Sequence, residues 1–175
     1  MRTLHLLRHA KAAGKAADGT DHARPLAARG IRSAKALAGY LAESNFQLKQ
    51  VFCSTAQRTR DTWQLGAPAL PSVSIGFCDQ LYLVDQGNLM EFIRGLPDAA
   101  DGVMIIGHNP AFHTTARSLA RNAASGHAKE LAALKVKFPT GALCSLQFNV
   151  AYWREVKAGG GILAGFIQPS DLADD

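Results

Sequence analysis

The stretch GVMIIGHNP, residues 102–110, contains a continuous apolar run that leads into a histidine. A run of this kind, without alternating polar residues, is typical of a strand that is buried on both faces of a sheet. Asn109 then predicts the N-cap of a helix, and Pro110 its first helical position. The stretch therefore indicates a strand followed by a helix, with His108 at the end of the sheet where α/β proteins bind ligands.

Two more junctions of the same kind occur earlier in the chain. Residues 3–7 predict a short strand that ends at Arg8 and His9. Residues 51–53 predict a second strand, and Arg58 lies one turn into the helix that should follow it. Each junction delivers a basic or imidazole side chain to the same edge of the predicted sheet.

The helix after the second strand is expected to run from 55 to about 65, because Ser54 and Gln57 form the pattern of a capping box. The other expected elements are a helix opened by Pro25, a strand at 73–77, a helix over about 89–96 and strand-like segments after Gly141. Strands that alternate with helices predict an α/β fold with a mostly parallel central sheet. The length of 175 residues predicts a single domain, residues 1–175.

The composition excludes several classes of protein. Mean hydropathy is −0.02 with 47% hydrophobic residues, as in globular chains, and no apolar run approaches the roughly 18 residues of a membrane span. The N-terminus lacks the apolar core of a secretory signal, which predicts a cytoplasmic protein. A net charge of +5 without a basic stripe gives no support for nucleic-acid binding. Cys53, Cys78 and Cys144 form no CxxC pair, which predicts reduced thiols and no metal site.

Arg8, His9, Arg58 and His108 are expected to meet in one cationic pocket. Two guanidinium groups and two imidazoles favour a phosphoryl group, whose oxygens accept the forked donors of arginine. Cationic neighbours also disfavour protonation of His9, so that a ring nitrogen of His9 can attack phosphorus. We therefore expect a phosphohistidine enzyme that water then hydrolyses, in a reaction without cofactor or metal.

Three segments carry a recognisable pattern: LLRHAK at residues 6–11, STAQRTRDT at 54–62 and IGHNP at 106–110. In that order they resemble the signature elements of the histidine phosphatase (phosphoglycerate mutase-like) superfamily. Four further segments are similar to its small SixA-like phosphohistidine phosphatase branch: RHAK, DHARPL, LY and KFPTGA, at residues 8–11, 21–26, 81–82 and 137–142.

This resemblance implies a three-layer α/β/α sandwich in which His9 accepts the phosphoryl group. Arg8, Arg58 and His108 would form the phosphate pocket. The implied substrate is phosphohistidine in a protein such as a phosphorelay domain. From the composition we expect no membrane or nucleic-acid partner, and we expect a monomer.

The chain departs from the larger members of the superfamily, which place a general acid after the third strand. Asp79 and Asp85 are the candidates here, and either can instead cap the helix that starts near Gln86. An ester hydrolase without such an acid would lose about 10²–10⁴-fold in rate. A phosphoramidate needs it less, because imidazole leaves as a neutral molecule when its other nitrogen is already protonated. A phosphomonoesterase or sugar-phosphate enzyme that uses Asp79 or Asp85 remains an alternative, as does a non-catalytic phosphate-binding module.

Four further residues are candidates for substrate binding: Lys11, Arg24, Asn109 and Thr140. Arg24 can equally pair with Asp21 and fix its loop, and the segment with Thr140 can equally be a plain turn. Arg60 competes with Arg58 for the pocket but fits the motif less well, so it is expected to face solvent. His22, His113 and His127 are interpreted as ordinary polar residues.

Overall fold

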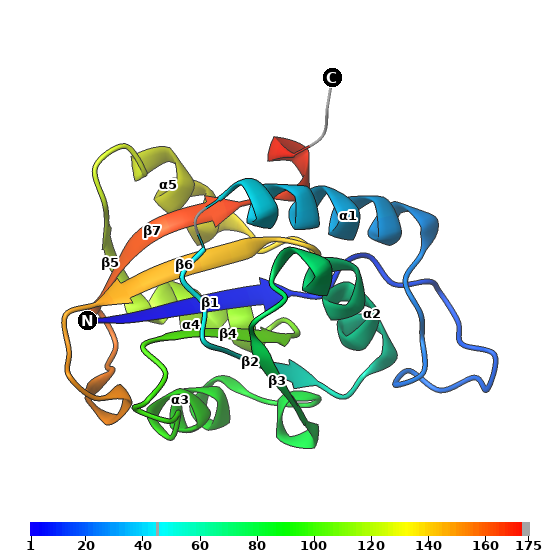
Figure 1. Ribbon diagram of the computed structural model, residues 1–175, viewed down its shortest axis with the longest axis horizontal. Helices are drawn as coiled ribbons and strands as arrows, with labels where there is room; N and C mark the ends of the chain where they lie inside the picture. The colour runs from blue at the N-terminus through cyan, green and yellow to red at the C-terminus, as the bar shows by residue number, and fades with distance from the viewer. Residues whose placement is uncertain (45, 173–175) are drawn as a thin grey trace.

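Residues 1–44 and 46–172 are described by the computed structural model, and within them seven strands form one sheet (Figure 1). The strands are β1 (Arg2–Arg8), β2 (Gln50–Ser54), β3 (Ser74–Cys78), β4 (Gly102–Gly107), β5 (Ala120–Ala123), β6 (Leu143–Phe148) and β7 (Gly161–Ile167). Their order across the sheet is β3-β2-β4-β1-β6-β7-β5. Only the pairings of β6 with β1 and β7 are antiparallel, so β6 runs against the other six strands. The predicted mostly parallel sheet is confirmed.

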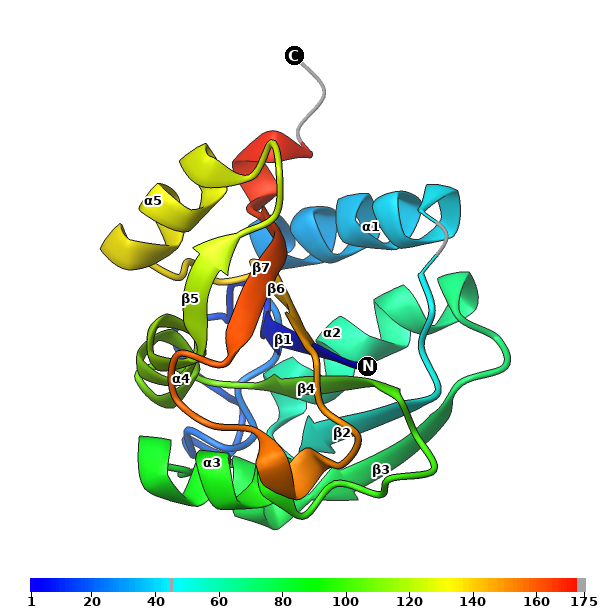
Figure 2. The same ribbon diagram turned by 90° about the vertical axis from the view of Figure 1, so that its left-hand side faces the viewer.

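Helices cover both faces of this sheet (Figure 2). They are α1 (Ala28–Glu43), α2 (Gln57–Gly66), α3 (Gln86–Arg94), α4 (Ala111–Leu119) and α5 (Ala128–Val136). On one face Leu37 of α1 and Trp63 of α2 belong to the same apolar cluster as Ile106 of β4. On the other, Ile105 of β4 shares a cluster with Phe112 of α4. Alternate residues of β4 thus enter opposite cores, as the apolar run of this strand predicts.

The order of the central strands brings the three predicted junctions together. β4 lies between β1 and β2 and is parallel to both, and Arg8 pairs in register with Gly107. The carboxyl ends of these three strands therefore share one edge of the sheet. Ser54 is the last residue of β2, and His9 and His108 directly follow the last residues of β1 and β4.

Two helix starts differ from the sequence expectation because the capping side chains bond elsewhere. Ser54 does not cap α2, because the N-cap of that helix is Ala56, which makes no side-chain hydrogen bond. The Ser54 hydroxyl is hydrogen-bonded to His108 instead. Asn109 does not cap α4, whose N-cap is Pro110, because its amide donates to the Phe138 carbonyl. The Asn109–Pro110 peptide bond is cis.

The first helix begins at Ala28, three residues after Pro25. Ala12 and Leu26 form an antiparallel bridge, and Ala27 N–H donates to the Lys11 carbonyl. These bonds hold residues 25–27 extended, so the helix starts only after them. Neither β5 nor α5 was expected from the sequence. No helix in the part of the chain that is described is long and apolar enough to cross a membrane.

Candidate active site

His9 is held by its own backbone and by β4. Its N–H donates to the Gly107 carbonyl at 3.0 Å, which fixes the residue beside the end of that strand. Its ring Nδ1 lies 2.7 Å from the Ala10 carbonyl, which can only accept, so Nδ1 carries the proton. Nε2 is then left with a free lone pair. The side chain is 8% exposed and its ring centroid lies 5.2 Å from that of His108.

The surroundings of His9 keep it neutral. Burial is the main cause that lowers its pKa to about 4, and the positive charges of Arg58, Arg8 and Arg24 contribute in the same direction against the opposing effect of the Ala10 carbonyl. The predicted direction is confirmed, although burial contributes more than the cations do. At neutral pH the Nε2 atom is therefore unprotonated, as the predicted nucleophilic role requires.

His108 follows β4 and contacts both of the other junctions. Its Nε2 lies 2.8 Å from the fully buried Ser54 hydroxyl, and its Nδ1 lies 3.5 Å from Arg58 Nη2. Burial, His9 and Arg58 lower the pKa of His108 to about 3. Because the guanidinium can only donate, Nδ1 accepts here and Nε2–H donates to Ser54. A hydroxyl can also donate, so Ser54 can support either tautomer of His108.

Arg58 is 7% exposed in the first turn of α2 and points back to the sheet edge. Its Nη1 donates to the Asp21 backbone carbonyl at 2.7 Å, and its Nη2 donates to Asp21 Oδ2 at 3.1 Å. Arg60 is exposed, with its guanidinium 5.1 Å from the Phe77 ring centroid. The interpretation of Arg58, rather than Arg60, as the buried arginine is confirmed.

Arg8 ends β1 and is tied to the turn before β6. Its Nη1 donates to the Phe138 carbonyl at 2.8 Å, while its Nε is buried and has no hydrogen-bond partner among the described residues. The amide of Asn109 donates to the same carbonyl at 2.9 Å, and Asn109 Oδ1 likewise has no partner within the described part of the chain. Buried polar atoms without partners are rare, so both can accommodate a bound group or water.

The turn 138–141 is bonded to the backbone of the predicted nucleophile. Gly141 N–H donates to the carbonyls of both Arg8 and His9, at 3.1 and 3.0 Å. Gly141 has φ +80°, a conformation that favours glycine. Thr140, its neighbour, is thereby held beside the site.

The other rim candidates lie on the loop between β1 and α1. Lys11 is exposed, and its backbone carbonyl is bonded to Ala27. Arg24 donates from Nη1 to Asp21 Oδ1 at 2.8 Å and from Nε to the Ala13 carbonyl at 2.8 Å. The Asp21–Arg24 pair named above is confirmed.

The two acid candidates have other partners. Asp85 is the N-cap of α3 and accepts from Asn88 N–H at 2.8 Å, as the capping alternative predicts. Asp79 accepts from the Thr55 hydroxyl at 2.6 Å. The described contacts join neither carboxylate to His9 or His108. No group of three potential metal ligands (His, Cys, Asp or Glu) occurs among residues 1–44 and 46–172.

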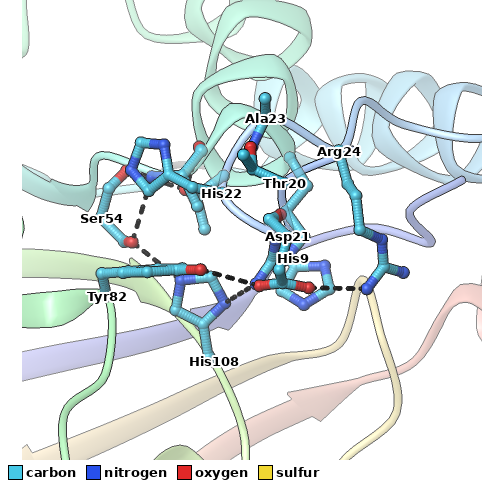
Figure 3. Close-up of polar contacts among 12 residues, drawn as sticks. His9, Thr20, Asp21, His22, Ala23, Arg24, Ser54, Tyr82 and His108 are labelled. Carbon is cyan, nitrogen blue, oxygen red and sulfur yellow. Dashed lines mark hydrogen bonds and ion pairs between the residues drawn. The ribbon is translucent and has the colours of Figure 1, made fainter. Parts of the chain in front are cut away.

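Sequence reasoning did not predict that Asp21, His22 and Tyr82 gather beside His9 and His108 (Figure 3). The Tyr82 hydroxyl donates to Asp21 Oδ2 at 2.9 Å, and the Tyr82 ring centroid lies 5.8 Å from that of His108. His22 packs edge-on against Tyr82, and its Nε2 lies 3.1 Å from the Thr55 hydroxyl. The segments DHARPL and LY contain Asp21, His22 and Tyr82, but no local pattern indicates the contacts among these residues, because the partners are up to 61 residues apart in the sequence.

Comparison with known proteins agrees with this geometry. The model of the histidine phosphatase superfamily (branch 1) matches residues 4–92. A relative named only as an uncharacterized protein of Mycobacterium tuberculosis is 34% identical over 93% of this chain and 99% of its own. The structure of a proposed phosphohistidine phosphatase SixA from Nakamurella multipartitia is similar with a TM-score of 0.79 and 28% identity, over 96% of each chain. A corresponding protein from Agrobacterium tumefaciens has a TM-score of 0.78 and 28% identity, over 96% of this chain and 98% of its own.

Proposed function

Because the chain belongs to the histidine phosphatase superfamily (branch 1), and is a hydrolase of that superfamily, we propose that it removes the phosphoryl group from phosphohistidine in a protein. The observation that carries this proposal is the bond from His9 Nδ1–H to the Ala10 carbonyl, which leaves Nε2 as the free nucleophilic atom. Both structural neighbours named as SixA, at 28% identity, support the choice of substrate. Residues 1–175 would act as one domain.

In the first step, the Nε2 lone pair of His9 attacks phosphorus and the P–N bond of the substrate breaks. The electron pair of that bond stays on the leaving nitrogen. When the other nitrogen of the substrate imidazole is protonated, the leaving group is neutral imidazole. Covalent transfer divides one difficult displacement into two easier ones.

Arg8, Arg58 and His108 would bind the three equatorial oxygens of the phosphoryl group. They would stabilise the negative charge on these oxygens while phosphorus passes from the substrate nitrogen to His9. Positioning and electrostatic stabilisation supply most of the catalysis in phosphoryl transfer. For this role His108 must donate from Nδ1, so its proton has to lie there. The Ser54 hydroxyl would then donate to Nε2 and hold that tautomer.

In the second step, water attacks the phosphorus on His9 and the new P–N bond breaks. Inorganic phosphate leaves, and Nε2 regains its lone pair. On the rim, Lys11, Arg24, Asn109 and Thr140 would contact the protein that carries the phosphohistidine. The partner is thus a phosphorylated protein, and the phosphoryl group is the part of it that the pocket binds.

The alternative of a phosphomonoesterase requires a proton donor for an alkoxide leaving group. Asp79 and Asp85 both have other partners. Asp21 is bonded to Arg58 and Arg24, and its neighbours lower its pKa to about 2, so it is ionised at neutral pH. These contacts support a phosphoramidate over an ester.

Phosphate release from a phosphohistidine protein and from p-nitrophenyl phosphate, measured side by side, tests the proposal. The wild-type protein should act on the first and only weakly on the second, and His9→Ala should be inactive on both. His127→Ala is the matched control, since His127 pairs with Glu130 at the surface. Strong ester turnover would favour the phosphomonoesterase, and an active His9→Ala protein would refute the phosphoenzyme.

A further inference from the structure

The carboxylate of Asp21 is held beside His9 and His108 by three donors from three parts of the chain (Figure 3). Oδ2 accepts from Arg58 Nη2 and from the Tyr82 hydroxyl, and Oδ1 accepts from Arg24 Nη1, at distances of 2.8–3.1 Å. This is the set of donors that a tetrahedral anion would use. The Asp21 carboxylate thus occupies the donors that an anionic ligand would use. Its side chain is half-exposed and lies on a loop.

Both terminal nitrogens of Arg58 already donate to Asp21. Nη1 donates to the backbone carbonyl of Asp21, and Nη2 donates to its carboxylate. A phosphoryl group that binds Arg58 through the fork formed by Nη1 and Nη2 therefore competes with one or both of these acceptors. The bonds from Tyr82 and Arg24 lower the pKa of Asp21 to about 2, so the group to be displaced is negatively charged at neutral pH.

The displacement is feasible because Asp21 lies in a segment with few apolar anchors. Residues 13–24 contain no helix or strand, and Asp21 and Arg24 both remain partly exposed. Burial of the loop therefore opposes a small movement only weakly. By contrast, Arg58 is nearly buried in α2 and would stay in place.

We propose that the Asp21 carboxylate competes with the phosphoryl group for Arg58. A bound phosphoryl group displaces this carboxylate, and the carboxylate returns to Arg58 as inorganic phosphate leaves. The inference rests on the proposed function only in that the same site binds the phosphoryl group. Asp21 sets the affinity for tetrahedral anions, and by weakening the complex with product it favours turnover. Its effect falls on binding and release, not on the attack by His9.

Titration with sodium tungstate, a tetrahedral dianion, measures this effect without requiring turnover. Asp21→Asn keeps an acceptor oxygen but removes the charge, and it should bind tungstate about tenfold more tightly than wild type, equivalent to about 1.4 kcal/mol. Asp18→Asn is the matched control, because Asp18 lies in the same loop and its carboxylate bonds only to Thr20. Asp18→Asn should bind as the wild type does. Thermal melting of both variants checks that the fold is intact.

A crystal structure of the wild-type protein with tungstate tests the displacement directly. The Asp21 carboxylate should have left Arg58 Nη2, and tungstate should lie in its place. If Asp21→Asn binds more weakly than wild type, Asp21 positions Arg58 and the inference is wrong. If tungstate binds while Asp21 stays on Arg58, the inference is also wrong. A protein that binds tungstate as expected but releases no phosphate from phosphohistidine would refute the proposed substrate and leave this inference intact.

Discussion

Lowering the pH from 7 to 5 should destabilise the fold, because three buried histidines resist protonation. Burial lowers the pKa of His5 to about 4, and burial together with neighbouring cationic groups lowers that of His9 to about 4 and that of His108 to about 3, against an ordinary value of 6.5. When a histidine has a lower pKa in the folded state, the unfolded chain binds its proton first as the pH falls. Stability is therefore complete above about pH 6.5 and is lost between there and about pH 4.

The size of this loss follows from the same values. At pH 5 each of the three histidines is largely protonated in the unfolded chain and largely neutral in the folded one. Each contributes a loss of about 2 kcal/mol in the free energy of unfolding relative to pH 7, or about 6 kcal/mol in total. Typical domains are stable by only about 5–15 kcal/mol. Asp21, with its pKa lowered to about 2 from 3.8, affects stability only at lower pH.

Urea unfolding at pH 7 and pH 5, at constant ionic strength, measures the difference. Trp63 and Trp153 are buried, so their fluorescence reports unfolding. His5→Asn and His108→Asn should each remove about a third of the pH dependence, whatever they do to stability at pH 7. His5 lies on β1 away from the candidate nucleophile, so its variant separates stability from activity. Equal unfolding free energies at the two pH values would show that the histidines are not held neutral, and the argument for a neutral His9 would fail with them.

Three substitutions test the contacts of the site and its loop. Arg58→Lys should lower kcat/KM on a phosphohistidine protein by about 10- to 100-fold, because lysine lacks the forked donors of arginine. Arg60→Lys, on the exposed side of α2, should leave kcat/KM unchanged. Equal effects of the two substitutions would contradict the assignment of Arg58 to the phosphoryl site. Ser54→Ala should lower kcat/KM about tenfold through the loss of one hydrogen bond to His108, and Ser33→Ala, whose hydroxyl bonds within α1, is its control. Gly30→Ala should cost about 1–3 kcal/mol in urea unfolding, because a Cβ there would lie 2.1 Å from the Lys11 carbonyl oxygen. Gly39→Ala in the same helix meets open space and should stabilise by up to about 1 kcal/mol, so a harmless Gly30→Ala would contradict the close packing.

The strand ends could be predicted from sequence because the signals there are local. The apolar run of β4 and the strand before Arg8 predicted both their burial and their place at one sheet edge. Local patterns misled where a distant partner competes for the same side chain. Ser54 has the sequence pattern of a capping residue, but its hydroxyl bonds to His108, 54 positions away.

The elements that were not predicted carry weak periodicity. β5 is a four-residue strand, Ala120–Ala123, at the edge of the sheet, and only one residue of α5, Leu134, is fully buried. Asp21 and Tyr82 meet only because the loop after β1 folds over the ends of β2 and β4. Such contacts depend on the complete fold, and no spacing within the chain indicates them.

The bonds from the turn 138–141 to Arg8 and His9 have a consequence for the protein during its synthesis. Arg8 and His9 are translated well before Phe138, yet the Phe138 carbonyl accepts the hydrogen bond that orients the Arg8 side chain. β6, which follows that turn, is also the neighbour that β1 lacks until then. A nascent chain therefore carries His9 before Phe138 and β6 exist. The proposed site can assemble only after residues 138–148 have been synthesised and β6 has paired with β1.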